Sequence, residues 1–158
     1  MRRASFPAAL AFAMLLAGAD GAAAIEPGGG MLGTWEIVAA APAPWSAPEQ
    51  RKALQAQADH ALHTIVEFKT NAVTSKLKPL NCKRRVVYED NAIAVDALFQ
   101  GNLPEPNPTE AAAKLGFPRG DIPGVDVKCL RALFTFHFRD PNTAMINLNR
   151  VLYTLKRQ

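Results

Sequence analysis

Three side chains of the types that bind zinc stand close together in the first half of the chain. His60, His63 and Glu67 are spaced so that a continuous helix would place them on one face. The stretch 65–68, however, has the β-branched and aromatic residues of a strand, and a change from helix to strand would separate the three. We therefore expect no metal site here.

The sequence contains no recognisable catalytic group. Ser46 stands three residues before Glu49, which is the spacing of a helix capping box, and the acidic residues share no motif that would pair two carboxylates. The segment 28–33 matches the letters G-x-G-x-x-G, but a dinucleotide site needs a strand before the loop and a helix after it. Here a strand follows. We expect a protein that is not an enzyme and needs no cofactor.

Residues 1–24 have the three parts of a secretory signal peptide. They comprise a positively charged start, the apolar stretch Phe6–Leu16 and the small residues Ala22–Ala24. The pattern predicts cleavage after Ala24, which would leave residues 25–158 as a single exported domain in the periplasm or outside the cell. No lipobox cysteine and no second long apolar run follows, so we expect no stable membrane anchor.

Cys82 and Cys129 both lie in the exported part of the chain. Two cysteines in an exported domain are most simply explained by one structural disulfide. A metal or redox site would need closer spacing, such as C-x-x-C, which the chain lacks. We therefore predict a Cys82–Cys129 disulfide.

A run of basic residues surrounds Cys82. Such a run could bind an anionic surface, for example lipid A phosphates or an acidic partner protein, or could simply be a solvated β edge that resists aggregation. Nucleic acid is not expected, because the compartment is wrong and no aromatic residues are interleaved with the charges. The formal net charge of +4 names no partner by itself. The run consists of Lys76, Lys78, Lys83, Arg84 and Arg85.

The C-terminal part has the clearest β pattern. Phe134, Phe136 and Phe138 alternate with Thr135 and His137, which places the phenylalanines on one face of a strand. On the opposite face we expect a histidine that faces solvent or is hydrogen-bonded. After a turn at 140–142 the chain resumes as a strand, so the pattern predicts a hairpin.

The remaining segments predict a mainly β fold with one or two helices. The capping box predicts a helix over 49–61, and the proline-containing stretch 90–124 predicts a crossover or cap with weak helical pieces at 92–99 and 109–115. Six or seven strands in sequence suggest an antiparallel meander that curls into a small barrel, which need not close completely. The predicted strands cover 33–38, 65–69, 73–77, 85–89, 134–138, 145–148 and 150–156.

Gly33-Thr34-Trp35, at the start of the first predicted strand, resembles the G-x-W motif of lipocalins and related calycin barrels. The resemblance implies that Trp35 closes one end of a barrel and that a small apolar ligand is held at the other. Because a meander closes only when its first strand meets its last, we expect Trp35 to be buried against the strand around 150–155.

The leading hypothesis is a non-catalytic periplasmic binding protein for a small apolar or amphipathic ligand. Trp45, Phe117 and Tyr153 are expected to line or cover the opening. The alternative is a protein-interaction module, such as an inhibitor of an envelope hydrolase of the lysozyme-inhibitor type, which would use exposed loops and the basic run. An enclosed apolar cavity would favour the first, and a filled barrel with a protruding loop the second.

Overall fold

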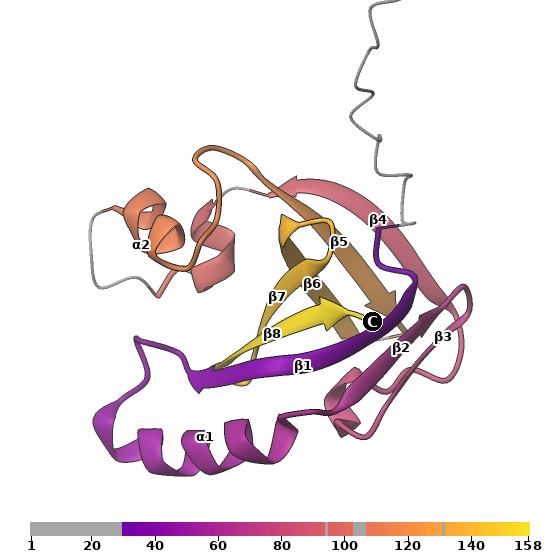
Figure 1. The fold of residues 1–158 in the computed structure, drawn as a ribbon, viewed down its shortest axis with the longest axis horizontal. Helices are drawn as coiled ribbons and strands as arrows, with labels where there is room; N and C mark the ends of the chain where they lie inside the picture. Colours follow the sequence, from indigo (N-terminus) through magenta and orange to yellow (C-terminus); the bar gives the residue numbers. More distant parts are fainter. Residues whose placement is uncertain (1–29, 94, 103–106, 131) are drawn as a thin grey trace, which may run out of the picture.

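The computed structural model describes residues 30–93, 95–102, 107–130 and 132–158 (Figure 1). The predicted signal peptide lies outside these residues. The α-helices and 3-10 helices are α1 (Pro48–Ala61), η1 (Lys78–Leu80), η2 (Val95–Phe99) and α2 (Pro108–Lys114). The strands are β1 (Gly33–Pro42), β2 (Ile65–Lys69), β3 (Ala72–Ser75), β4 (Val86–Ile93), β5 (Ile122–Cys129), β6 (Ala132–Asp140), β7 (Thr143–Leu148) and β8 (Val151–Arg157).

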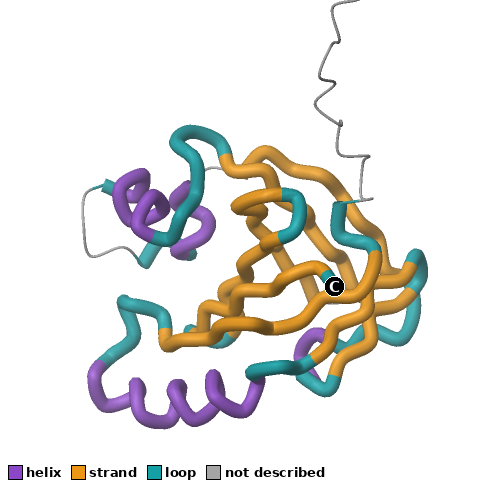
Figure 2. Tube along the Cα trace, in the orientation of Figure 1, coloured by secondary structure: helices purple, strands orange, loops and turns teal. Residues whose placement is uncertain are grey.

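The strands form one antiparallel sheet with the order β3-β2-β1-β8-β7-β6-β5-β4. Except for the contact of β1 with β8, neighbours in the sheet are neighbours along the chain, as the sequence predicted for a meander. Figure 2 shows the strands curling around a common interior into a nearly closed barrel, with the helices outside the sheet. Among the described residues, no helix is long and apolar enough to span a membrane.

Apolar side chains fill the interior of the barrel. Phe134, Phe136 and Phe138 are buried there, as the alternation predicted, and the Phe136 ring packs edge-on against Phe68 of β2 at 5.2 Å. Tyr153 of β8 is fully buried in the same cluster. Burial of large aromatic and aliphatic side chains is the main stabilising contribution in a domain of this size.

Trp35 lies at one end of the barrel, and the expectation that it contacts the last strand is confirmed. It is fully buried and stands opposite Arg157 in the β1–β8 ladder. The Arg157 guanidinium lies 4.5 Å from the centre of the indole, and the indole N–H donates to the main-chain oxygen of Met31 at 2.9 Å. Arg157 also donates to the main-chain oxygen of Leu32 at 2.6 Å. These bonds tie the start of β1 to the end of β8.

Helix α1 follows β1 and packs against the barrel through its small residues. Ala58 and Ala61 are buried, and the side chain of Gln57 donates to the Tyr153 hydroxyl at 3.2 Å. The helix occupies the predicted range, but the predicted capping box is wrong. Ala47 is the N-cap residue and makes no side-chain bond, while the Ser46 hydroxyl donates to the main-chain oxygen of Arg150. Ser46 therefore joins α1 to the β7–β8 turn.

A second apolar cluster covers the outer face of the sheet. The predicted cap is present as η2, α2 and the residues that follow, but its predicted range of 90–124 was too wide, because 90–93 belong to β4 and 122–124 to β5. The cap packs on outward-facing residues of β7 and β8. Trp45, in the loop between β1 and α1, contacts this cluster with its ring edge-on to Phe99 at 5.5 Å. The buried members are Ala43, Leu98, Phe99, Ala112, Phe117, Ile122, Met145 and Leu152.

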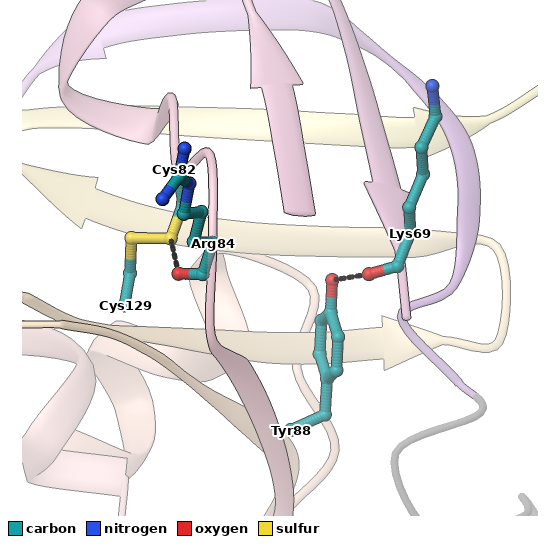
Figure 3. Close-up of a disulfide and its surroundings, with 5 residues drawn as sticks. All are labelled: Lys69, Cys82, Arg84, Tyr88 and Cys129. Carbon is teal, nitrogen blue, oxygen red and sulfur yellow. Dashed lines mark hydrogen bonds between the residues drawn. A yellow bond between two sulfur atoms is a disulfide. The ribbon is translucent and has the colours of Figure 1, made fainter. Parts of the chain in front are cut away.

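The predicted disulfide is present and closes the barrel between β3 and β4 (Figure 3). Cys82 exchanges two main-chain hydrogen bonds with Val73 of β3, and its sulfur is bonded to Cys129 at the end of β5, with the two Cα atoms 5.9 Å apart. The Tyr88 hydroxyl of β4 donates to the main-chain oxygen of Lys69 at 2.8 Å. The disulfide and this hydrogen bond together hold the two edges of the sheet close.

Candidate functional site

The β6–β7 hairpin opens along its length. Its ladder runs from Asp140 opposite Thr143 to His137 opposite Met145, with a register shift on the way, and ends there. Beyond that point β6 still pairs with β5, and β7 with β8. The two strands therefore diverge between their outer neighbours, and Figure 1 shows them leaving the hairpin in different directions. A register shift adds local twist, which favours such a divergence.

The divergence leaves a cleft of about 430 Å³, which we call the β6–β7 cleft. One wall comes from β6, another from β7 and the β7–β8 turn, and a third from the cap. The floor consists of buried residues and the mouth of exposed ones. The lining residues are Ala97, Leu98, Gln100, Leu133, Phe134, Thr135, His137, Ile146, Asn147, Leu148, Asn149 and Arg150.

Two polar side chains in the floor of the cleft have no hydrogen-bond partner within the described part of the chain. His137 and Asn147 are only 3% and 8% exposed, and neither the imidazole nitrogens nor the amide nitrogen and oxygen make a hydrogen bond of good geometry. The main chain of Met145 and Thr135 lies near the imidazole but is poorly aligned with it. Buried polar groups are almost always paired, and an unpaired one lowers stability by about 1–3 kcal/mol. The sequence prediction for His137 is thus half right. It lies opposite the phenylalanines and is not exposed, and its contacts with the main chain of Met145 and Thr135 fall short of well-aligned hydrogen bonds.

The site is electrically neutral at its centre. Burial lowers the pKa of His137 from the usual 6.5 to about 4, and the nearby main chain and the Asp126 carboxylate oppose this only in part. Asp126 itself is occupied, because it accepts from the Thr135 hydroxyl at 2.6 Å and from the Asn91 amide at 3.2 Å. A neutral imidazole both donates and accepts a hydrogen bond, as does an amide. The floor therefore suits hydrogen bonding to an uncharged group.

Acidification should destabilise the protein through His137. The pKa of His137 is lower in the folded chain than in the unfolded one, so below pH 6.5 the unfolded chain takes up a proton that the folded chain does not. The free energy of unfolding is therefore unaffected by this group above pH 6.5 and falls as the pH drops toward 4. Between pH 7 and pH 5 we expect a loss of about 2 kcal/mol. Urea midpoints at the two pH values measure it, and His137→Phe should show a much smaller change. Equal losses in both proteins would contradict the assignment.

The mouth of the cleft is built by the β7–β8 turn. Asn149 and Arg150 both have a positive φ, of 53° and 65°, as the two central residues of a type I′ hairpin turn do. The Arg150 guanidinium donates to the side chain of Gln50, which joins the turn to α1. This places the charged group of Arg150 at the rim, while the floor near His137 stays uncharged.

The residues predicted from sequence to line a ligand site fall into two places. Trp45 and Phe117 come together in the outer cluster under the cap, half-buried and buried respectively. Tyr153 lies in the interior cluster instead, with its hydroxyl bonded to Gln57. None of the three lines the β6–β7 cleft. Their role in binding stays a prediction.

The five basic residues of the predicted run are all exposed, at the end of the barrel that carries the disulfide.

The three residues weighed as zinc ligands do not share a helical face, because α1 ends at Ala61. His63 pairs with Glu36 of β1 at 2.7 Å, and Glu67 lies on β2. Within the described ranges, no group of three or more metal-binding side chains is present.

Sequence reasoning missed Thr135 and Asn147 as site residues. A faint signal was available, because both are polar residues inside strands whose neighbours are apolar, and each is on the face opposite the phenylalanines.

Comparison with protein-family models, with curated proteins and with solved structures finds no match for this chain.

Proposed function

We propose that the protein is a non-catalytic binding protein that holds a small amphipathic molecule in the β6–β7 cleft. The observation that carries the proposal is the pair of buried, unpartnered side chains His137 and Asn147. A ligand that hydrogen-bonds to both would remove the desolvation penalty that they cause in the free protein. That gain is available only in the bound state, so it contributes directly to affinity.

The chemistry of the lining describes the ligand. Phe134, Ile146 and Leu98 offer an apolar surface, while His137 and Asn147 offer one donor–acceptor pair each. The cleft volume of about 430 Å³ lies within the usual range for small-molecule sites. The expected ligand has an apolar body and an uncharged head, such as a carbonyl, amide or alcohol.

We also propose that the barrel is of the lipocalin-like kind and that the protein works in the periplasm or outside the cell. Gly33 and Trp35 at the start of β1, with the indole fully buried beside the last strand, support the first point. The Cys82–Cys129 disulfide supports the second, since such bonds persist in oxidising compartments. Side chains fill the interior, so the enclosed apolar cavity expected from the sequence as the sign of a ligand carrier is not found there among the described residues. The ligand proposal therefore rests on the β6–β7 cleft and not on the barrel interior.

Binding can be tested with the uncharged fluorescent ketone Prodan, which has an apolar ring system and one carbonyl acceptor. We expect wild-type protein to enhance and shift its emission. His137→Phe and Asn147→Leu should each weaken binding by about tenfold, the effect of one hydrogen bond to a buried group. His60→Phe, an exposed site on α1, is the matched control. Undiminished binding in both cleft variants would refute the site.

Asn147→Leu should at the same time stabilise the unliganded protein. The substitution replaces a buried, unpaired amide with an apolar side chain of similar shape, so we expect the free energy of unfolding to rise by about 1–2 kcal/mol. Urea denaturation measures the change. A marked loss of stability would instead show that Asn147 serves the fold, and would remove the main support for the proposal.

A further inference from the structure

The three most exposed large apolar side chains of the described residues gather at one end of the barrel. Val87, Leu133 and Leu130 are 50%, 58% and 74% exposed. Val87 and Leu133 flank Lys128 on the same side of the sheet, one on β4 and the other on β6. Leu130 lies two residues beyond Lys128, in the β5–β6 turn. We call these three residues the apolar tip.

The backbone at Leu130 indicates that the fold alone does not favour this residue. Its φ is 51°, in the left-handed region where a leucine side chain is strained and glycine or asparagine is preferred. The side chain packs little of its surface against the protein, since about three quarters of it is exposed. An apolar residue that is both strained and exposed at a turn suggests that its side chain contacts another molecule.

The disulfide places positive charge beside the apolar tip. Cys129 immediately precedes Leu130, and its partner Cys82 immediately precedes Lys83 and Arg84, both of which are exposed. Figure 3 shows Arg84 beside the disulfide. The disulfide therefore holds Lys83 and Arg84 near Leu130, from which they are distant in sequence. Lys128 lies between the apolar residues and pairs with Glu89 at 2.5 Å.

We propose that this end of the barrel docks on the anionic surface of a phospholipid bilayer. The apolar tip would enter the headgroup region, and Lys83, Arg84 and Arg85 would meet the lipid phosphates. A protein partner is less well supported, because a stable interface buries about 800 Å² on each side and three side chains at a turn offer much less. Leu133 belongs both to the apolar tip and to the lining of the β6–β7 cleft, whereas Leu130 and Val87 do not line the cleft, so the inference can be tested at Leu130 independently of the ligand proposal.

Co-sedimentation with vesicles tests the inference. The probes are vesicles of phosphatidylcholine alone and of phosphatidylcholine mixed with phosphatidylglycerol, at low and high salt. We expect the wild-type protein to sediment with the anionic vesicles and to be released by salt. Lys83→Gln with Arg84→Gln should weaken binding by more than about tenfold, since each cation near the surface contributes about a factor of five.

Leu130→Asn separates docking from folding. Asparagine accepts the left-handed backbone, so the variant should fold at least as well, yet its vesicle binding should fall several-fold. Leu62→Asn, an exposed leucine at the end of α1, is the matched control and should bind like wild type. Absence of sedimentation with anionic vesicles, equal binding to neutral vesicles, or unchanged binding of Leu130→Asn would each overturn the inference. Prodan binding by Leu130→Asn should be normal, so the two proposals can fail separately.

Discussion

Replacing Trp35 with alanine should lower the free energy of unfolding by about 3–5 kcal/mol, the usual range for truncating a buried tryptophan. The indole is fully buried, packs edge-on against Phe138 at 6.0 Å and lies under the Arg157 guanidinium. Its N–H satisfies the main-chain oxygen of Met31. The substitution therefore leaves a cavity, an unpaired carbonyl and a guanidinium without its aromatic partner, all where β1 meets β8.

Urea midpoints of three variants measure this contribution. Trp35→Phe keeps most of the ring but loses the hydrogen bond to Met31, so its loss should be clearly smaller than that of Trp35→Ala. Trp45→Ala truncates a half-buried ring that contacts Phe99 in the cap, and it should lose less than half as much as Trp35→Ala. Equal losses for Trp35→Ala and Trp45→Ala would show that closure of the barrel at Trp35 is not a principal source of stability.

Strand β6 was predictable because apolar and polar residues alternate along it in the sequence, although the structure buries His137 as well as the phenylalanines. Phe134, Phe136 and Phe138 point to the interior, and the turn at 140–142 follows directly, so local pattern alone gave the β6–β7 hairpin. The segment 65–69 was predicted with its observed bounds for the same reason. Local side-chain chemistry is enough to predict a strand where β-prone residues stand beside a clear turn, but it does not show that the second face is buried too.

Strand β5 was missed, because Pro123 and Gly124 suggested a break in the chain. In the structure Pro123 pairs in register with Ala92, near the start of the strand, where the proline is exposed and the ladder is beginning. Val125 and Val127 then alternate inward as an ordinary strand does. The capping box failed similarly, since the Ser46 hydroxyl bonds to Arg150, a residue far away in sequence that local pattern could not reveal.

The β6–β7 cleft could not be predicted from sequence. It exists because the ladder stops at His137, and both flanking strands hold β6 and β7 apart. His137 and Asn147 both line this cleft, and residues of the cap form another of its walls. Alternation showed the face on which His137 lies, whereas its burial and lack of a partner depend on segments distant along the chain.

Removing the disulfide by Cys82→Ser with Cys129→Ser should lower the free energy of unfolding by about 2–4 kcal/mol. The bond spans 47 positions of sequence and therefore restricts the unfolded chain strongly. In the folded chain it is also the covalent link between the β3 edge and β5, at the point where the barrel closes. Urea denaturation of the double variant gives the total effect, and replacing both cysteines avoids a free thiol.

Tyr88→Phe is the matched control, because it removes the hydrogen bond to Lys69 across the same closure while keeping the disulfide. Its loss should be about 1 kcal/mol. Trypsin then shows where the double variant opens. Because the basic run between β3 and β4 is exposed, cleavage there should accelerate in the double variant well before cleavage elsewhere, but not in Tyr88→Phe. Unchanged cleavage at the run would mean that β3 stays against β4 without the disulfide, and that the bond acts only by restricting the unfolded chain.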